Sequence, residues 1–245
     1  MRLTRLAAII AIACCTLAAS AQVTYENTRA KANRFFDNSE WASAAAVYGL
    51  MLHERPSIPD TYGRAIVSYE MLDEEGRAME LLNSAMNHGV SLDSVLTNVQ
   101  KHSYAIGQGP LYEQFINQAY AAHPWMQRPL DAYLLRYYTE RRNGPMMVKV
   151  AQRMLQGSPD NINFMATEAD GEMISGNTAN AVEIWKKILA IAPDNYLAIL
   201  QLANYYDLNG QGAEALPYFR RAKAIRATPY VDDRIRAIDE AINKK

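Results

Sequence analysis

The sequence predicts an all-α fold in which about six helix–turn–helix repeats follow one another and a last helix closes the C-terminal end. The first observation is a period. Pro56, Pro124, Pro159 and Pro193 lie 68, 35 and 34 residues apart, which is two, one and one units of about 34 residues. The second is that residues of one kind recur at fixed positions of this unit, and the third is that turn residues fall at matching places. A fixed period of this length indicates a chain of stacked repeats.

With this period, the repeat region is expected over residues 22–229, followed by a polar capping helix over residues 230–245. The predicted repeats occupy residues 25–58, 59–92, 93–127, 128–161, 162–195 and 196–229. The capping helix is predicted from apolar residues three or four positions apart, at Val231, Ile235, Ile238 and Ile242. An open-ended array of repeats needs such a polar cap.

Two positions of the repeat are expected to form its core. Position 20 is alanine in most repeats, which lets the two helices of a repeat approach closely, and position 24 is apolar and fills the space between neighbouring repeats. The residues at position 20 are Ala44, Ala78, Tyr112, Met147, Ala181 and Ala215, and those at position 24 are Tyr48, Leu82, Ile116, Ala151, Trp185 and Phe219.

The turn residues agree with this frame. Pro110 and Pro145 both stand at position 18, where a proline can begin the second helix without losing a hydrogen bond. Asn161 and Asn195 stand just before a first helix, where they can cap it. These places predict the helix boundaries independently of the apolar positions.

The period and its positions resemble the tetratricopeptide repeat (TPR), which has an aromatic residue at position 11, alanine at 20, an aromatic at 24 and alanine at 27. The sixth repeat matches best, with Leu202, Ala203, Tyr206, Gly210, Ala215, Phe219 and Ala222. The third and fourth repeats depart from the pattern at Tyr112, Met147 and Arg142, so we expect an irregular centre. The resemblance implies an α–α superhelix that binds other proteins and catalyses no reaction.

Residues 1–21 are predicted to be a signal peptide. Arg2 and Arg5 form a basic head, an apolar stretch follows, and Ala19-Ser20-Ala21 has the small residues that signal peptidase accepts, so that Gln22 becomes the new N-terminus. The sequence therefore predicts an exported protein, and the periplasm is the expected compartment.

The alternative is a lipid anchor at Cys14, which follows Ala11-Ile12-Ala13. In that case, the chain would be a membrane-tethered TPR lipoprotein of an outer-membrane assembly machine. If cleavage follows Ala21 instead, both cysteines, Cys14 and Cys15, are removed with the leader.

Several functional classes are not predicted. The net charge of −1 gives no basic field for nucleic acid. Outside the N-terminus, no apolar run reaches the ~18 residues of a spanning helix. Three of the four histidines are expected near the ends of second helices, where histidine commonly faces solvent or the helix dipole. No two of the four stand three or four residues apart, so no helical metal site is predicted; they are His53, His88, His102 and His123. We expect no cofactor, metal or enzymatic activity.

The resemblance also implies where a partner would bind. In TPR proteins, the concave groove is lined by the first helix of each repeat, chiefly at positions 2, 5, 9, 12 and 13, and a groove of mixed charge suits a peptide or a partner helix. Lys101 and Arg136 share position 9 of adjacent repeats, so we expect them side by side, facing an acidic group of the partner. The expected groove residues are Arg29, Asn33, Phe36, Glu70, Lys101, Tyr104, Arg136, Asp170, Asn204 and Asp207.

Overall fold

The computed structural model describes residue 22 and residues 24–243, and all the regular secondary structure among them is helical. The chain divides into two compact units, unit 1 ending at Met126 and unit 2 beginning at Gln127. The division falls between the third and fourth predicted repeats. The predicted signal peptide and both cysteines lie outside the described residues.

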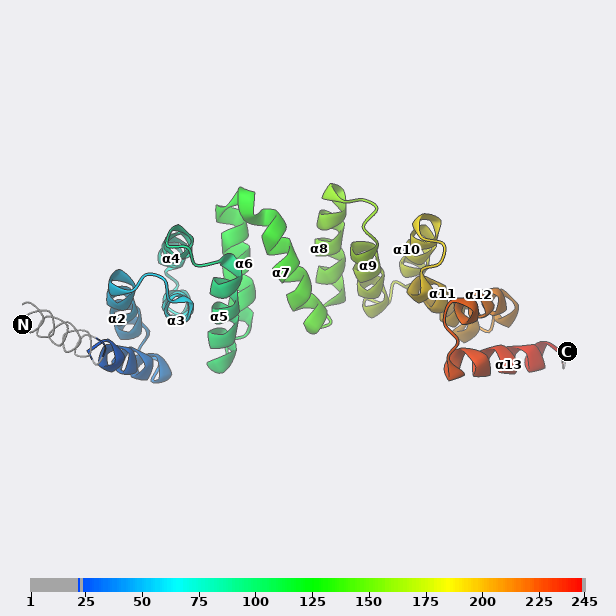
Figure 1. Cartoon of the computed structure of the whole chain (residues 1–245), viewed down its shortest axis with the longest axis horizontal. Helices are drawn as coiled ribbons and strands as arrows, with labels where there is room; N and C mark the ends of the chain where they lie inside the picture. The colour runs from blue at the N-terminus through cyan, green and yellow to red at the C-terminus, as the bar shows by residue number, and fades with distance from the viewer. Residues whose placement is uncertain (1–21, 23, 244–245) are drawn as a thin grey trace, which may run out of the picture. The chain divides into compact units, whose positions relative to one another are not determined.

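Unit 1 contains three pairs of helices, one for each of the first three predicted repeats (Figure 1). The first helices of the pairs pack on one another as well as on their own partners: α3 contacts α2, α4 and α5. In chain order, the elements are residues 24–37, α2 (Trp41–Glu54), α3 (Pro59–Glu70), α4 (Glu75–Asn87), α5 (Leu92–Ala105), α6 (Pro110–Ala122) and the short 3₁₀ helix η1 (Pro124–Met126).

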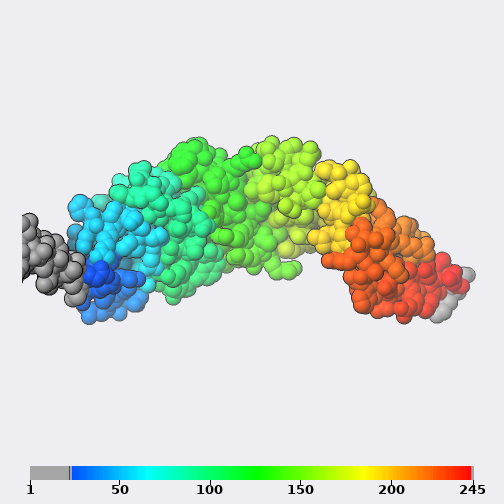
Figure 2. Space-filling model, in the orientation of Figure 1, coloured from blue at the N-terminus to red at the C-terminus, as the bar shows by residue number. Residues whose placement is uncertain are grey.

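Unit 2 contains three further pairs and the last helix. Each helix packs against its neighbours in the chain, as the adjoining colour bands of unit 2 in Figure 2 show. The elements are α7 (Gln127–Glu140), α8 (Gly144–Gly157), α9 (Ile162–Ile174), α10 (Thr178–Ile191), α11 (Tyr196–Leu208), α12 (Gly212–Ile225) and α13 (Pro229–Asn243).

The turn inside each pair has the same backbone geometry in all six pairs that the structure describes. Its key residue has a positive φ, between 52° and 80°, at Ser39, Asp73, Gly107, Arg142, Gly176 and Gly210. The next residue donates its N–H to the carbonyl five residues earlier, as from Asn143 to Tyr138 at 2.9 Å and from Gln211 to Tyr206 at 2.8 Å. This hydrogen bond satisfies a carbonyl group at the end of the first helix, which would otherwise lack a donor. Arg142 therefore adopts the same left-handed conformation as the glycines, although its sequence departs from the pattern.

The predicted core positions are buried in every repeat. All the residues at positions 20 and 24 are at most 3% exposed, including the large Tyr112 and Met147. Next to Met147, the following helix contributes Gly171, where an added Cβ would lie only 3.0 Å from the Met147 Cβ and 2.9 Å from the carbonyl oxygen of Gly144. A missing side chain on α9 thus makes room for a large one on α8.

Helix α13 packs on α12 and occupies the place of the predicted capping helix. Val231 and Ile238 are buried under it, whereas Ile242 is exposed. The ion pair of Lys223 with Asp232, at 2.7 Å, ties the two helices together at the surface. Within the described part of the chain, no helix has the length and apolar character needed to cross a membrane.

Candidate functional site

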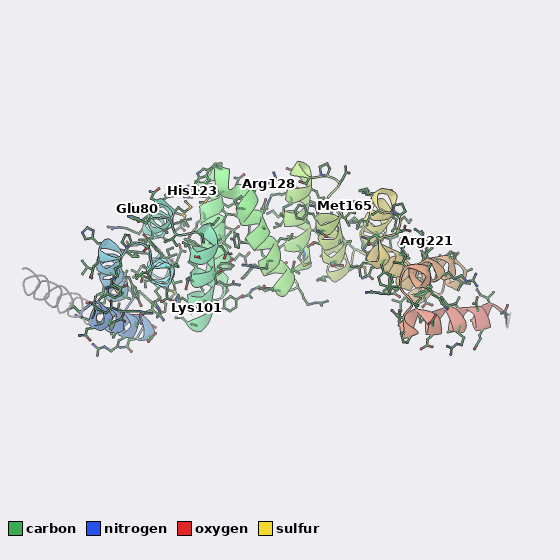
Figure 3. The ribbon with its side chains drawn as sticks, viewed as in Figure 1. Glu80, Lys101, His123, Arg128, Met165 and Arg221 are labelled. Carbon is green, nitrogen blue, oxygen red and sulfur yellow. The ribbon has the colours of Figure 1, made fainter. Side chains whose placement is uncertain are left out.

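The first helices of unit 1 carry a polar cluster centred on Asp60, near the start of α3. Lys101 Nζ and His102 Nε2, both from α5, each lie 2.9 Å from Asp60 Oδ1 (Lys101 is labelled in Figure 3). The hydrogen bond from His102, reinforced by Lys101, holds the pKa of the Asp60 carboxyl well below its usual range, although burial opposes this. The cluster therefore joins the first helices of repeats two and three and keeps Asp60 charged.

Arg64 links the same cluster to the first repeat. Its Nε lies 3.4 Å from Asp60 Oδ2, its Nη1 lies 3.8 Å from Asp37 Oδ1, and its guanidinium carbon is 5.0 Å from the centre of the Phe36 ring. The Arg64 Nε is buried, and no atom of the described residues accepts a hydrogen bond from it. The Arg64 side chain is 19% exposed, and a partly buried guanidinium with a spare donor can bind a carboxylate or a carbonyl oxygen of a ligand.

A cavity of ≈ 450 Å³ opens beside this guanidinium. It offers a cation from Arg64 and, at its rim, an anion from Asp37, whose side chain is 71% exposed. Its lining comes from residues 24–37 and the turn after them, from α3 and from the end of α5: Phe36, Asp37, Ser39, Arg64, His102, Ala105 and Ile106. We name it the unit 1 cavity.

Unit 2 has a cavity of ≈ 370 Å³ in a corresponding place, which we name the unit 2 cavity. Thr139, Asp170, Met173 and Gln201 bring the first helices α7, α9 and α11 to its wall. Met173 is 41% exposed and gives the cavity an apolar wall, and burial raises the pKa of the Asp170 carboxyl. The remaining lining residues are Arg142, Met147 and Ile174.

Two of the expected groove residues hold the capping helix instead. Tyr230 donates its hydroxyl hydrogen to Asn204 Oδ1 at 2.7 Å. The Arg234 guanidinium donates to both oxygens of Asp207, at 2.7 and 2.8 Å. Asn204 and Asp207 are thus engaged within unit 2, where they fix α13 against α11.

Two other expected groove residues, Phe36 and Glu70, are buried, although Phe36 still lines the unit 1 cavity. Phe36 is 2% exposed because its ring packs edge-on against Trp41 and Tyr48. Glu70 is 3% exposed because it ends α3 beneath α6, where Gln114 contacts it.

The remaining expected groove residues of unit 1 stay at the surface. Arg29 lies 3.7 Å from Glu26 on the same helix, and both side chains are exposed. Asn33 accepts a hydrogen bond from Tyr48 at 2.9 Å, which partly covers it. Tyr104 is 45% exposed.

Lys101 and Arg136 have neighbours within their own units. The charge of Lys101 is paired with Asp60, and the Arg136 guanidinium carbon lies 5.3 Å from the centre of the Tyr133 ring. Their expected adjacency would join unit 1 to unit 2 and stays a prediction. The ion pair with Asp60 also explains why a cation stands at position 101 without invoking a ligand.

Sequence reasoning missed Asp60, Arg64 and His102. His102 is 2% exposed, because it lies between Asp60 and the Phe36 ring. Neighbouring residues of a helix point in different directions, so with Lys101 exposed, His102 faces α3. This difference in direction was the sequence signal that could have indicated its burial. Among the described residues, no three His, Cys, Asp or Glu side chains gather closely enough to hold a metal ion.

No family model and no curated protein matches the sequence. Among solved structures, the chain resembles the C-terminal part of a TPR repeat-containing protein from Cytophaga hutchinsonii. The two are 17% identical, the match covers 86% of this chain and 85% of that one, and the TM-score is 0.50. The fold is the tetratricopeptide repeat. The same TPR array also matches a chain in a structure of Naa15/Naa10 bound to HypK-THB, with 12% identity, 90% of this chain and 35% of that chain covered, and a TM-score of 0.53. These identities establish the fold alone, so the function has to be argued from the two cavities.

Proposed function

We propose that this TPR protein is a non-enzymatic interaction scaffold of the cell envelope, and that its first helices bind a peptide or a helix of a partner protein. The observation that carries the proposal is that both cavities are lined by first helices of successive repeats. Shallow cavities that alternate charged and apolar walls suit the side chains of a bound polypeptide better than a compact small molecule.

The two cavities support different contacts. The unit 1 cavity offers Arg64 for a carboxylate or carbonyl group and Asp37 for a basic group. The unit 2 cavity offers the apolar side chain of Met173 beside the carboxyl of Asp170. A peptide segment of mixed charge would match the unit 1 cavity, and a segment with an apolar anchor would match the unit 2 cavity. In unit 1, His102 is already committed to Asp60, which favours binding over proton transfer.

A first prediction tests the unit 2 cavity. Met173→Glu should weaken binding of the native partner at least about tenfold, because a charge would replace an exposed apolar anchor. The partner is the protein that the wild-type chain retains from its native envelope, and its affinity for purified variants is measured by calorimetry. Since Met173 is 41% exposed, the melting temperature should hardly change.

Lys187→Glu is the matched control, because Lys187 is exposed on the second helix α10 and lines neither cavity. It should leave the affinity unchanged. If Lys187→Glu weakens the partner and Met173→Glu does not, the binding surface lies on the second helices and the proposal fails.

A second prediction concerns the envelope setting, which the leader sequence supports. N-terminal analysis of the exported protein should find Gln22 as the first residue. An acylated Cys14 as the first residue would contradict this and would favour the lipoprotein alternative.

A further inference from the structure

The turns that lead from one repeat to the next in unit 2 carry exposed aliphatic side chains. Ile191 and Ile225 are the last residues of the second helices α10 and α12, and Leu197 is the second residue of the first helix α11. Their exposed fractions are 44%, 44% and 64%. Because a short turn joins α11 to α12 and the two helices pack together, the end of α12 lies beside the start of α11. The three side chains therefore gather at one end of these helices.

Two arginines at the end of α12 lie among these side chains. Arg221 donates from Nη2 to the carbonyl oxygen of Pro193 at 2.6 Å, which holds it against the turn after α10 (Arg221 is labelled in Figure 3). The guanidinium carbon of Arg226 lies 4.0 Å from the centre of the Tyr196 ring, at the start of α11. Arg221 also precedes Ile225 by four residues, so the two share a face of α12. We name these five exposed residues the unit 2 patch: Ile191, Leu197, Arg221, Ile225 and Arg226.

The positive charges of the unit 2 patch are not neutralised within the described part of the chain. Both arginines are exposed, and their contacts are with a carbonyl oxygen and an aromatic ring rather than with a carboxylate. Other basic residues of α12 are paired: Arg220 lies 3.1 Å from Asp239, and Lys223 lies 2.7 Å from Asp232. A guanidinium carries several N–H donors, so donors remain for an anion.

We propose that the unit 2 patch docks this protein on an anionic lipid bilayer, with its guanidinium groups on lipid phosphates and its aliphatic side chains in the headgroup region. Exposed aliphatic side chains flanked by basic residues are typical of surfaces that bind membranes peripherally. A protein partner would instead be expected to fill a pocket with its main anchors. The patch residues line neither the unit 2 cavity nor the cavity of ≈ 500 Å³ between α12 and α13, and a fluid bilayer needs no pocket.

The test is co-sedimentation with phospholipid vesicles of the chain from Gln22 onwards, because the apolar stretch of the predicted leader would bind lipid by itself. All the described helices lie within this part of the chain. We expect binding to vesicles of equal amounts of phosphatidylcholine and phosphatidylglycerol, which weakens as NaCl is added, and little binding to phosphatidylcholine alone. Arg226→Gln should weaken binding to the anionic vesicles about fivefold, the usual contribution of one basic residue near such a surface.

The aliphatic part of the patch has a matched control in the same helix. Leu197→Ser should weaken binding to the anionic vesicles at least about threefold, because its side chain no longer enters the headgroup region. Leu208→Ser should bind like the wild type, although Leu208 is 87% exposed, because it ends α11 at the opposite turn. Arg128→Gln is the control for charge: Arg128 is exposed in unit 2 and hydrogen-bonds Ser158 rather than a carboxylate. It should also bind like the wild type.

Three results would overturn the proposal. The first is that the chain does not bind the anionic vesicles at low salt, in which case an acidic protein surface becomes the candidate occupant of the patch. The second is equal binding to both kinds of vesicle. The third is that the two controls weaken binding as much as the patch variants do. Far-UV circular dichroism verifies that each variant keeps its helices. The assay contains no peptide, so its outcome is independent of peptide binding at the two cavities.

Discussion

Gly63→Ala should destabilise unit 1 by about 1–3 kcal/mol, the usual effect of forcing an extra methyl group into a packed contact. Gly63 lies in α3 where that helix meets α5. A Cβ added there would be 2.5 Å from the Asn98 Cβ and 2.8 Å from the Asn98 carbonyl carbon. The second of these atoms is backbone, so a rotamer change cannot relieve the clash and the two first helices must separate.

The sign of this effect is diagnostic, because alanine normally stabilises a helix interior by up to about 1 kcal/mol relative to glycine. Gly49, in α2, is the control: it is exposed, and an added Cβ would meet no atom within 4 Å. Gly49→Ala should therefore stabilise unit 1. Amide hydrogen exchange in α2, α3 and α5 measures both variants locally, which suits a chain of two units. A gain in protection for Gly63→Ala would show that α3 and α5 do not pack as described.

The repeat could be predicted from the sequence because its determinants are local and recur. The left-handed turn residue returns at each repeat whether it is Gly107, Gly176 or Arg142, since the flanking helices impose the conformation. The burial of the alanines at position 20 could be predicted without knowing which residues contact them. Met147, taken alone, suggested an irregular repeat, but the space for its side chain comes from Gly171 on the next helix.

The candidate site was harder to predict because the same repeat position has different surroundings in different repeats. Glu70 and Tyr104 both occupy position 12, yet Glu70 is 3% exposed and Tyr104 is 45% exposed. Helix α6 contacts α3 and covers Glu70. Likewise, Asp60 meets Lys101 and His102 across 41 and 42 residues, a pairing of charges that the period does not specify. The period identifies a face of each helix, and the neighbouring repeat decides what covers it.

Glu70→Gln should make unit 1 more stable at pH 8, by up to about 3 kcal/mol, and hardly change its stability at pH 4. The pKa of Glu70 is raised from 4.5 to about 7 in the folded chain. Below pH 4.5, the carboxyl is protonated in both the folded and the unfolded chain, so it contributes no pH dependence. As the pH rises from 4.5 to 7, the unfolded chain releases this proton first and the folded state loses stability. Glutamine keeps the shape and the acceptor for Gln114 and adds a donor that can reach Gln118.

The measurement is amide exchange or urea unfolding of the full chain at several values between pH 4 and pH 8, with α3 as the reporter of unit 1. Other groups also titrate in this range, so the informative quantity is the difference between variant and wild type at each pH. Glu80→Gln, on the exposed surface of α4 (Figure 3), is the matched control and should leave this difference near zero throughout. A constant difference for Glu70→Gln would mean that the carboxyl is solvated in the folded chain. A loss of stability at pH 8 would mean that an ionised Glu70 is already stabilised by partners in the folded chain.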